Sequence, residues 1–244
     1  MATDSEREVF ESKILRPVGQ NAARLSASEV TGFLAMAGHA WDGGLMVVGR
    51  AVNGWFYGIR PDRLAASVEV SRYAKLVQEE SAGNGKCPMR WVTTGWGATK
   101  DYNTKRSAFW RCIRDVVQRL NIADVNGADW ASHLVWSNLY KISPAVGGNP
   151  NVLLRAVQFR GCSELFNLEL RTYQPSHVLF LTGIDWAGPF LQAADLREPG
   201  LSYVKQCGRI AVGDAREARC VIADHPQGKL GHEWVDDVVA AFDR

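Results

Sequence analysis

The stretch Cys220-Val221-Ile222-Ala223-Asp224-His225-Pro226 determines both the expected fold and the expected position of a functional site. Its first four residues are apolar, and strands of parallel sheets that are covered on both faces have such continuous apolar runs. The polar residues that follow come at the carboxyl end of the strand, where open α/β sheets bind their ligands. The stretch therefore predicts a parallel sheet with a ligand site that includes His225.

Further apolar runs and helical periodicities extend this pattern over the chain. We expect additional strands at 45–48, 133–137 and 177–181, with an extra hairpin or edge strand within 200–213. We expect helices at 61–80, 107–120, 147–173, 186–194 and 232–242. In the third of these, Asn149 is the expected cap and Pro150 lies in the first turn. Strands that alternate with helices favour an α/β fold with a mostly parallel sheet covered on both sides, in a single domain spanning residues 1–244.

Three segments have less regular patterns. Residues 4–15 predict a polar helix, and we expect segment 1–25 to be a peripheral helical arm because it carries little apolar surface. Residues 26–29, Ser-Ala-Ser-Glu, have the spacing of a capping box, and apolar residues at helical intervals then predict a helix that ends at Gly38. Residues 91–103 contain Gly95 and Gly97, which suits an irregular, mobile flap beside a cleft.

Composition limits the classes of protein to consider. The net charge of +2 neither demands nor excludes nucleic acid, because a phosphate backbone needs only a local basic face. The five cysteines occur singly, without a C-x-x-C pair, which favours a reducing cytoplasm. The amino-terminal residues lack the pattern of a secretory signal, and no apolar run is long enough to cross a bilayer. We expect a cytoplasmic monomer with no membrane partner.

The loops that follow the predicted strands are the candidates for chemistry. They match no Walker loop, no dinucleotide-binding G-x-G-x-x-G, no nucleophile elbow and no zinc-ligand spacing, so the common cofactor enzymes are disfavoured. In chain order they are Gly49-Arg50-Ala51, residues 137–144 (Ser-Asn-Leu-Tyr-Lys-Ile-Ser-Pro), the helix with Cys162 and Leu165 to Leu170, the stretch Pro175 to Gly183, and His225-Pro226. This ordered set resembles the uracil-DNA glycosylase superfamily, and its middle part is most similar to the iron–sulfur branch.

The resemblance implies a three-layer αβα sandwich around a four-stranded parallel sheet. It also implies an enzyme that flips uracil or a related damaged base out of DNA and hydrolyses its N-glycosidic bond. His225 matches the histidine that stabilises negative charge on the departing base, and Asn138 matches the asparagine that reads the Watson–Crick edge. The alternative reading of either residue is an ordinary contact at a strand end.

Other site residues follow from the same resemblance. Ala51 and Asn53 are expected to line the base pocket, with Asn53 as the candidate to hold the attacking water, although asparagine before glycine is also a common turn pair. Phe56 is a candidate to stack on the flipped base. Lys229 and Leu230 are expected to contact DNA, with Leu230 wedged into the vacated stack or, alternatively, serving only as an apolar contact before the last helix.

A basic stretch forms a further candidate for phosphate contacts, against the alternative of a solvated helix face. It comprises Lys100, Lys105, Arg106, Arg111 and Arg114.

The chain also departs from the family pattern. Arg50 lies where the iron–sulfur branch often has glutamate, so the ordinary carboxylate is missing. Only Cys162 has a counterpart among the cluster cysteines, since Ile142 replaces another, and we expect no iron–sulfur cluster, no other cofactor and no metal. Two alternatives stay open, namely a catalytically inactive module of the same fold that binds nucleic acid or a nucleobase, and an unrelated α/β enzyme acting on a small nucleotide or sugar.

Overall fold

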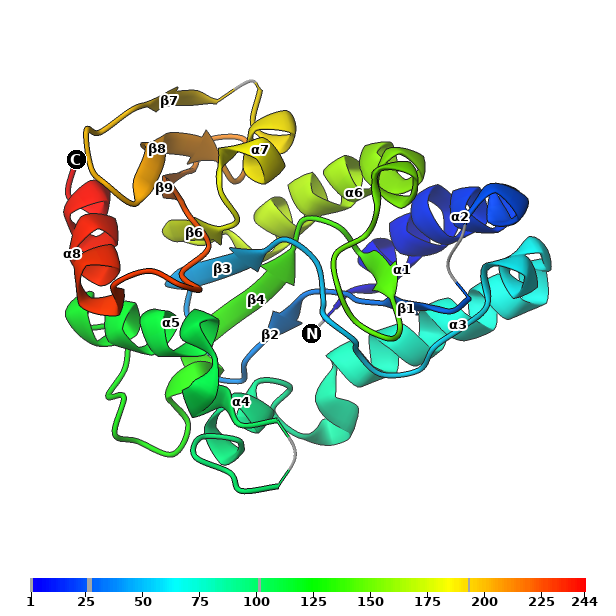
Figure 1. Cartoon of the computed structure of the whole chain (residues 1–244), viewed down its shortest axis with the longest axis horizontal. Helices are drawn as coiled ribbons and strands as arrows, with labels where there is room; N and C mark the ends of the chain where they lie inside the picture. The colour runs from blue at the N-terminus through cyan, green and yellow to red at the C-terminus, as the bar shows by residue number, and fades with distance from the viewer. Residues whose placement is uncertain (1, 26–27, 101, 193) are drawn as a thin grey trace. The chain divides into compact units, whose positions relative to one another are not determined.

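The apolar runs of the sequence form neighbouring strands of one mixed sheet in the computed structural model (Figure 1). Within the described residues, 2–25, 28–100, 102–192 and 194–244, this sheet has seven strands in the order β2-β4-β3-β6-β9-β8-β7. Their bounds are β2 Met36–Ala37, β3 Leu45–Gly49, β4 Leu134–Asn138, β6 His177–Leu181, β7 Asp195–Arg197, β8 Val204–Ala211 and β9 Glu217–Ala223. The fold is therefore mixed α/β.

Strand direction divides the sheet into two parts. The pairs β3/β6 and β6/β9 are parallel, whereas β8 pairs antiparallel with both β9 and β7. All five residues of β3 are buried, as expected for a strand covered on both faces. The described sheet differs from the expected four mostly parallel strands because residues 204–211 form a long antiparallel strand, while β2 and β7 are too short to leave a periodic signal.

The chain forms two compact units, each made of three stretches. The first unit comprises residues 1–36, 49–85 and 137–172, and the second comprises residues 37–48, 86–136 and 173–244. Most of the seven-stranded sheet belongs to the second unit, and the chain passes into the first unit at the carboxyl ends of β3 and β4.

The amino-terminal segment belongs to the core of the first unit. Helix α1 (Asp4–Val9), the π-helical turn η1 (Phe10–Leu15) and α2 (Arg16–Gln20) follow one another without a break, and Thr3 caps α1. The side chains of Phe10, Ile14 and Val18 are fully buried. The expectation of a peripheral arm is therefore wrong for the described residues, because apolar residues spaced by four place one helical face inward.

Residues 30–32 and 36–37 form strands and no helix lies between them, so the helix predicted there is wrong. Strand β1 (Val30–Gly32) pairs antiparallel with β5 (Ile142–Pro144) in the first unit, and β2 follows at 36–37. Residues 26 and 27 of the predicted capping box lie outside the described residues. The spacing of apolar residues suggested a helix because every residue from 30 to 37 is buried. A fully buried strand lacks the alternation of apolar and polar residues that would distinguish it from a helix.

The other predicted helices lie near their expected positions, and the structure adds helix α4. The first unit contains the 3-10 turn η3 (Pro61–Ala65), α3 (Ser67–Ser81) and α6 (Val152–Tyr173), while the second contains α4 (Arg90–Thr94), α5 (Ala108–Arg119), α7 (Ile184–Ala187) with η7 (Gly188–Phe190), and α8 (Gly231–Phe242). Helix α6 begins after Pro150, and Asn151 rather than Asn149 caps it by accepting from the Leu154 N–H. Helix α4 covers residues 91–94 at the start of the predicted irregular segment 91–103, so that segment is not irregular throughout. Among the described residues no helix combines the length and apolar character that a membrane crossing requires.

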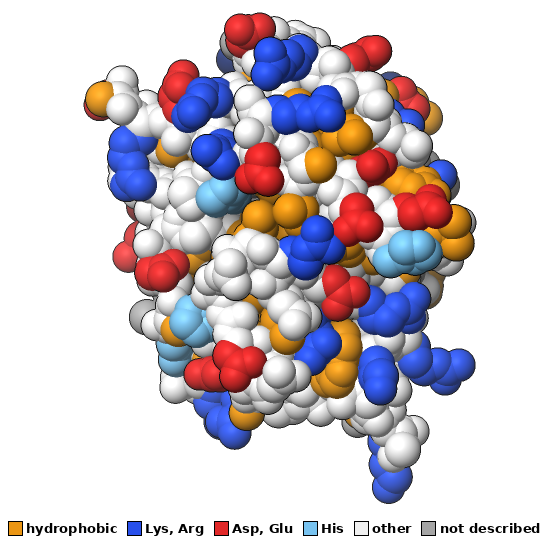
Figure 2. All heavy atoms as spheres, turned by 90° about the vertical axis from the view of Figure 1, so that its left-hand side faces the viewer, with side chains coloured by type: hydrophobic (Ala, Val, Ile, Leu, Met, Phe, Trp, Pro, Cys, Tyr) orange, Lys and Arg blue, Asp and Glu red, His pale blue; other side chains and the backbone are white. Residues whose placement is uncertain are grey.

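Charged side chains are unevenly spread over the surface. The chain has 28 Lys and Arg against 26 Asp and Glu, yet Lys and Arg gather at the lower right of the face shown in Figure 2. A net charge of only +2 is therefore compatible with a local excess of positive charge on one part of the surface.

Candidate functional site

Two loops that the sequence marked for chemistry are hydrogen-bonded to each other in the first unit. One follows β3 and contains Ala51, and the other follows Asn138, the last residue of β4. The bonds run from Leu139 N to Gly49 O (2.9 Å), from Tyr140 N to Arg50 O (3.0 Å) and from Ser143 Oγ to Val52 O (2.7 Å). The structure thus brings together the loops of the predicted base-binding residues Ala51 and Asn138.

Asn138 ends β4 as a buried amide, with 2% of its surface exposed. Its Nδ2 has no hydrogen-bond partner among the described residues. A buried polar group without a partner costs about 1–3 kcal/mol, so each such group needs an explanation. A ligand carbonyl that accepts from Nδ2 would supply the missing partner.

Buried polar side chains hold the loop on both sides of Asn138. The Nζ of Lys141 lies 2.6 Å from Oε1 of Glu169 on α6, and Ser137 Oγ donates to Oε2 of the same carboxylate at 2.7 Å. Lys141 Nζ also donates to Ser137 Oγ at 2.9 Å, and all three side chains are fully buried. Because Ser137 and Lys141 flank Asn138, this network fixes the backbone from which the amide projects.

Gln158 on α6 anchors the next part of the same loop. Its Oε1 accepts from the backbone N–H groups of Lys141 (3.1 Å) and Ile142 (2.9 Å), while its Nε2 donates to Ile142 O at 2.8 Å. The Cys162 thiol also donates to Gln158 Oε1, at 3.3 Å, and burial raises the pKa of Cys162 to about 12. Cys162 is therefore a neutral thiol that supports the loop.

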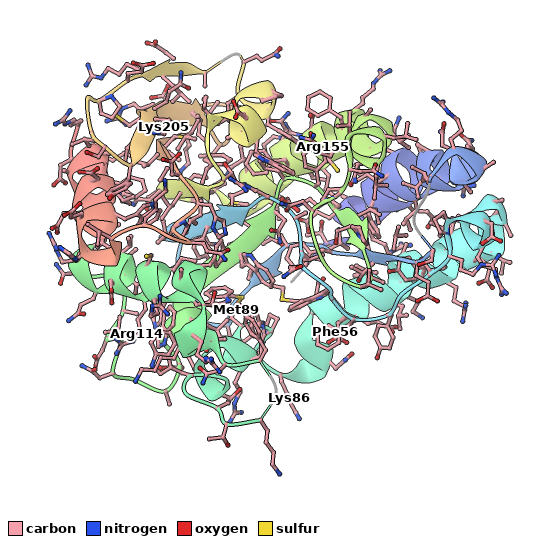
Figure 3. The ribbon with its side chains drawn as sticks, in the orientation of Figure 1. Phe56, Lys86, Met89, Arg114, Arg155 and Lys205 are labelled. Atoms are coloured by element: carbon pink, nitrogen blue, oxygen red, sulfur yellow. The ribbon has the colours of Figure 1, made fainter. Side chains whose placement is uncertain are left out.

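Asn53 and Phe56 lie in the loop that follows β3. Asn53 Oδ1 accepts from the Gly148 N–H, and Gly54 adopts a φ of 67°, so the backbone bends at the Asn-Gly pair. Phe56 is 49% exposed and packs edge-on against Trp55, with ring centroids 4.8 Å apart (Figure 3). The exposed ring of Phe56 is accessible for stacking, whereas the Oδ1 of Asn53 already accepts a backbone hydrogen bond.

His225 lies in the second unit, two residues after β9. Its Nδ1 accepts a hydrogen bond from the Gln227 N–H at 3.3 Å, and its ring stacks on Phe109 with centroids 6.3 Å apart and planes at 29°. An Nδ1 that accepts a hydrogen bond carries no proton, so the proton of the neutral ring is on Nε2. The arrangement presents Nε2 as a hydrogen-bond donor.

The loop after β9 also carries the two predicted DNA contacts. Lys229 Nζ lies 3.8 Å from Oδ2 of Asp224, which also pairs with Lys205 at 3.1 Å. Leu230 directly precedes α8 and is 55% exposed. His225, Lys229 and Leu230 therefore share one loop. Asn138 belongs to the other unit, and the pairing of Asn138 with His225 stays a prediction.

Sequence reasoning missed the buried charges of the first unit. Burial, followed in size by the repulsion of the Glu169 carboxylate, raises the pKa of Glu6 from 4.5 to about 7. Glu169 gave no sequence signal beyond its place beside Leu170, in the predicted helix that contains Cys162. In the part of the chain that the structure describes, no group of three or more His, Cys, Asp or Glu side chains could hold a metal ion.

Comparison with known proteins gives no family. No protein-family model matches the chain, and no curated protein matches it. A functional proposal therefore depends on the fold class and on the chemistry of these loops.

Proposed function

We propose that this chain is a DNA glycosylase that hydrolyses the N-glycosidic bond of uracil or a related damaged base. In this proposal β4, β3, β6 and β9 form the central strands of a three-layer αβα sandwich. DNA is the partner, and no cofactor or metal takes part. The base leaves its stack to reach the enzyme, at an unstacking cost of a few kcal/mol.

The observation that carries the proposal is the buried Asn138 amide, whose Nδ2 has no partner among the described residues. Uracil presents an N3–H donor and an O4 acceptor on its Watson–Crick edge. Asn138 Nδ2 would donate to O4 and its Oδ1 would accept from N3–H. The network of Ser137, Lys141 and Glu169 supports this role because it holds the loop rigidly, which favours selection of one base over another.

His225 has the complementary role in this proposal. As the bond between N1 and the sugar C1′ breaks, its electron pair moves onto the base, and His225 Nε2–H donates to the base O2. The Gln227 N–H supports the role because it holds the ring in the required tautomer. Water adds its hydroxyl to C1′ and its proton completes the released base. Asn53 and the backbone at Ala51 border the water, while Phe56 stacks on the base and Lys229 and Leu230 contact the DNA.

The test is release of uracil from single- and double-stranded oligonucleotides, measured as abasic sites. We expect His225→Ala to lower the rate constant about 100-fold or more, as for loss of other groups that stabilise developing charge. His232→Ala is the matched control, since His232 is an exposed histidine of the same unit and is expected to leave the rate unchanged. If the unaltered chain released uracil no faster than the His225→Ala variant, the proposed activity would be rejected.

A second candidate is a binding module of the same fold without chemistry. Two observations favour it. Arg50 stands where a carboxylate would orient the attacking water, and Asn53 Oδ1 already accepts a hydrogen bond from the Gly148 N–H. Salt-sensitive binding of the same oligonucleotides without base release would select this function over the glycosylase.

A further inference from the structure

Positive charge is concentrated in one segment of the second unit, residues 86–114. Seven of the chain's 28 basic residues lie there with a single acidic residue, Asp101, out of 26. The seven are Lys86, Arg90, Lys100, Lys105, Arg106, Arg111 and Arg114. We call this segment the basic segment, and without it the rest of the chain has more acidic than basic residues.

The side chains of the basic segment form no ion pair with a carboxylate among the described residues, although Arg114 and Arg111 lie close enough to Asp115 to oppose the rise that burial causes in the pKa of its carboxyl group. Six of the seven are exposed and Arg114 is half-buried. By contrast, a surface hollow in the first unit has three arginines that all form ion pairs. Those pairs are Arg60 with Asp62, and Arg63 and Arg72 with Glu69. The arginines of the hollow are therefore paired with carboxylates, whereas Lys86, Arg90, Lys100, Lys105 and Arg106 are exposed and form no ion pair among the described residues.

Hydrogen bonds order the described parts of the basic segment at residues 92–95 and 104–111. Thr104 Oγ1 donates to Val92 O at 2.7 Å, and the Thr104 N–H donates to Gly95 O at 3.1 Å. Arg111 Nη1 donates to the carbonyls of Lys105 (3.1 Å) and Arg106 (3.0 Å), which ties α5 to the turn before it. Cations on an ordered backbone lose less entropy when they bind an anion.

Aromatic rings connect this surface to His225 within the second unit. Tyr102 is 59% exposed and lies 6.2 Å from the Trp91 ring, which packs at 5.3 Å against Trp110. Phe109 lies 5.1 Å from Trp110 and stacks on His225. In the same segment the Arg114 guanidinium (labelled in Figure 3) lies 5.1 Å from the centroid of the Trp96 ring. The exposed ring of Tyr102 and the imidazole of His225 are thus the ends of one packed aromatic row.

We propose that the basic segment binds the DNA strand that carries the target nucleotide to His225. Its lysines and arginines contact successive phosphates, and Tyr102 stacks on an unpaired base beside the target. Basic grooves with exposed aromatic rings bind single strands in this way, because every base has a face for stacking. The assignment rests on the proposed function for the role of His225, but the binding itself can be measured without base release.

The charge contribution is tested with a double variant, Lys105→Gln with Arg106→Gln. Both side chains are exposed, so the fold should be retained. We expect a uracil-free 20-nucleotide single strand, followed by fluorescence anisotropy, to bind about tenfold more weakly at low salt. The slope of log K against log salt should fall by about 1.4, since each phosphate contact on a single strand contributes about 0.7.

The matched control removes the same charge elsewhere in the second unit. Arg209 and Arg216 are exposed and lie outside the basic segment, and Arg209→Gln with Arg216→Gln should leave both affinity and slope unchanged. Equal losses in the two double variants would overturn the assignment, because they would show a response to net charge alone. Absence of salt-dependent binding by the unaltered chain would overturn it as well.

Stacking is tested separately at Tyr102. Tyr102→Ala should weaken single-strand binding about fivefold or more without changing the salt slope, while Tyr102→Phe should retain the affinity, because stacking depends on the ring and not on the charge. If Tyr102→Ala bound the single strand as tightly as the unaltered chain, Tyr102 would not be part of the proposed DNA-binding surface.

The two proposals fail in different ways. DNA binding that depends on Lys105 and Arg106 without uracil release would support the surface and reject the glycosylase. Uracil release that is unaffected by the Lys105→Gln, Arg106→Gln variant at subsaturating DNA would support the glycosylase and reject the surface.

Discussion

The ammonium group of Lys141 lies 2.6 Å from the carboxylate of Glu169, and both side chains are fully buried in the first unit. Removing two charges from water costs several kcal/mol per ion, and the cost is offset only when further hydrogen bonds satisfy both groups. Ser137 Oγ supplies such bonds by accepting from Lys141 and donating to Glu169. Because Ser137 and Lys141 flank Asn138, the ion pair links stability to the geometry of the candidate base-reading amide.

Breaking this pair from one side should destabilise the protein strongly. Lys141→Met leaves the Glu169 carboxylate buried without its partner, and we expect a loss of about 3–5 kcal/mol in the free energy of unfolding. The double variant Lys141→Met with Glu169→Leu should recover most of that loss, because it removes both charges of the pair. Urea unfolding at pH 7 measures both effects.

The control for this prediction is the exposed pair of Lys75 and Glu79 on α3, where Lys75→Met should change stability by less than about 1 kcal/mol. Equal effects of Lys141→Met and Lys75→Met would contradict the buried pairing.

Stability should depend on pH through Glu6. Its pKa is about 7 in the folded chain against 4.5 in the unfolded chain, mainly because of burial and then because of Glu169. The folded state binds the proton more tightly, so this contribution to stability is fully present below pH 4.5 and is lost as the pH rises through about 7. Between pH 5 and pH 8 the loss amounts to about 2–3 kcal/mol.

Glu6→Gln tests this dependence while keeping an oxygen that can accept the capping bond from Thr3 N. The variant should lose the pH-dependent part, which urea unfolding at pH 5 and pH 8 detects. The exposed residue Glu8 provides the comparison, since Glu8→Gln should keep the pH dependence of the unaltered chain. A Glu6→Gln variant with unchanged pH dependence would show that Glu6 is ionised in the folded state.

The central strands could be predicted from the sequence because their apolar runs are short and continuous. The residues of β3, β6 and the second half of β9 are almost all buried, and such runs between polar loops have few other interpretations. Asn138 and His225 could be located for the same reason, since Asn138 is the last residue of β4 and His225 comes two residues after β9. The long strand β8 was expected only as an unspecified edge element.

The buried polar groups could not be predicted because periodicity reports only apolar faces. Glu169 lies beside the buried Leu170 in α6, yet a glutamate in a helix ordinarily indicates solvent. Its burial is understandable only with Lys141, which is 28 residues away in the chain. Strand β1 could not be predicted for a similar reason, since its partner strand β5 lies more than 100 residues further along the chain.

A single glycine in α6 should report the packing of the amino-terminal helix. A Cβ built on Gly161 would lie 2.1 Å from the Lys13 carbonyl oxygen, which is backbone and cannot move aside cheaply. We expect Gly161→Ala to destabilise the protein by about 1–3 kcal/mol through overpacking, despite the better helix propensity of alanine. Urea unfolding checks this against Arg160→Ala, an exposed change in the adjacent position that should be nearly neutral. A stabilised Gly161→Ala variant would show that the amino-terminal helix does not pack on α6.

The five cysteines should differ sharply in their reaction with iodoacetamide at pH 8. Cys87 is half-buried, whereas Cys112, Cys162, Cys207 and Cys220 are buried. Burial raises the pKa of Cys112 to about 11 and that of Cys162 to about 12, so these two hold almost no thiolate, the reactive form. Mass spectrometry of the native protein should therefore show one fast modification, at Cys87, and none of comparable rate in Cys87→Ser.

The Cys162 thiol should react only as fast as the first unit opens, because its donation to Gln158 holds it beneath the loop that follows Asn138. Rapid labelling of Cys162 in folded Cys87→Ser protein would contradict this packing, and would also remove the rigid support on which the role of Asn138 depends.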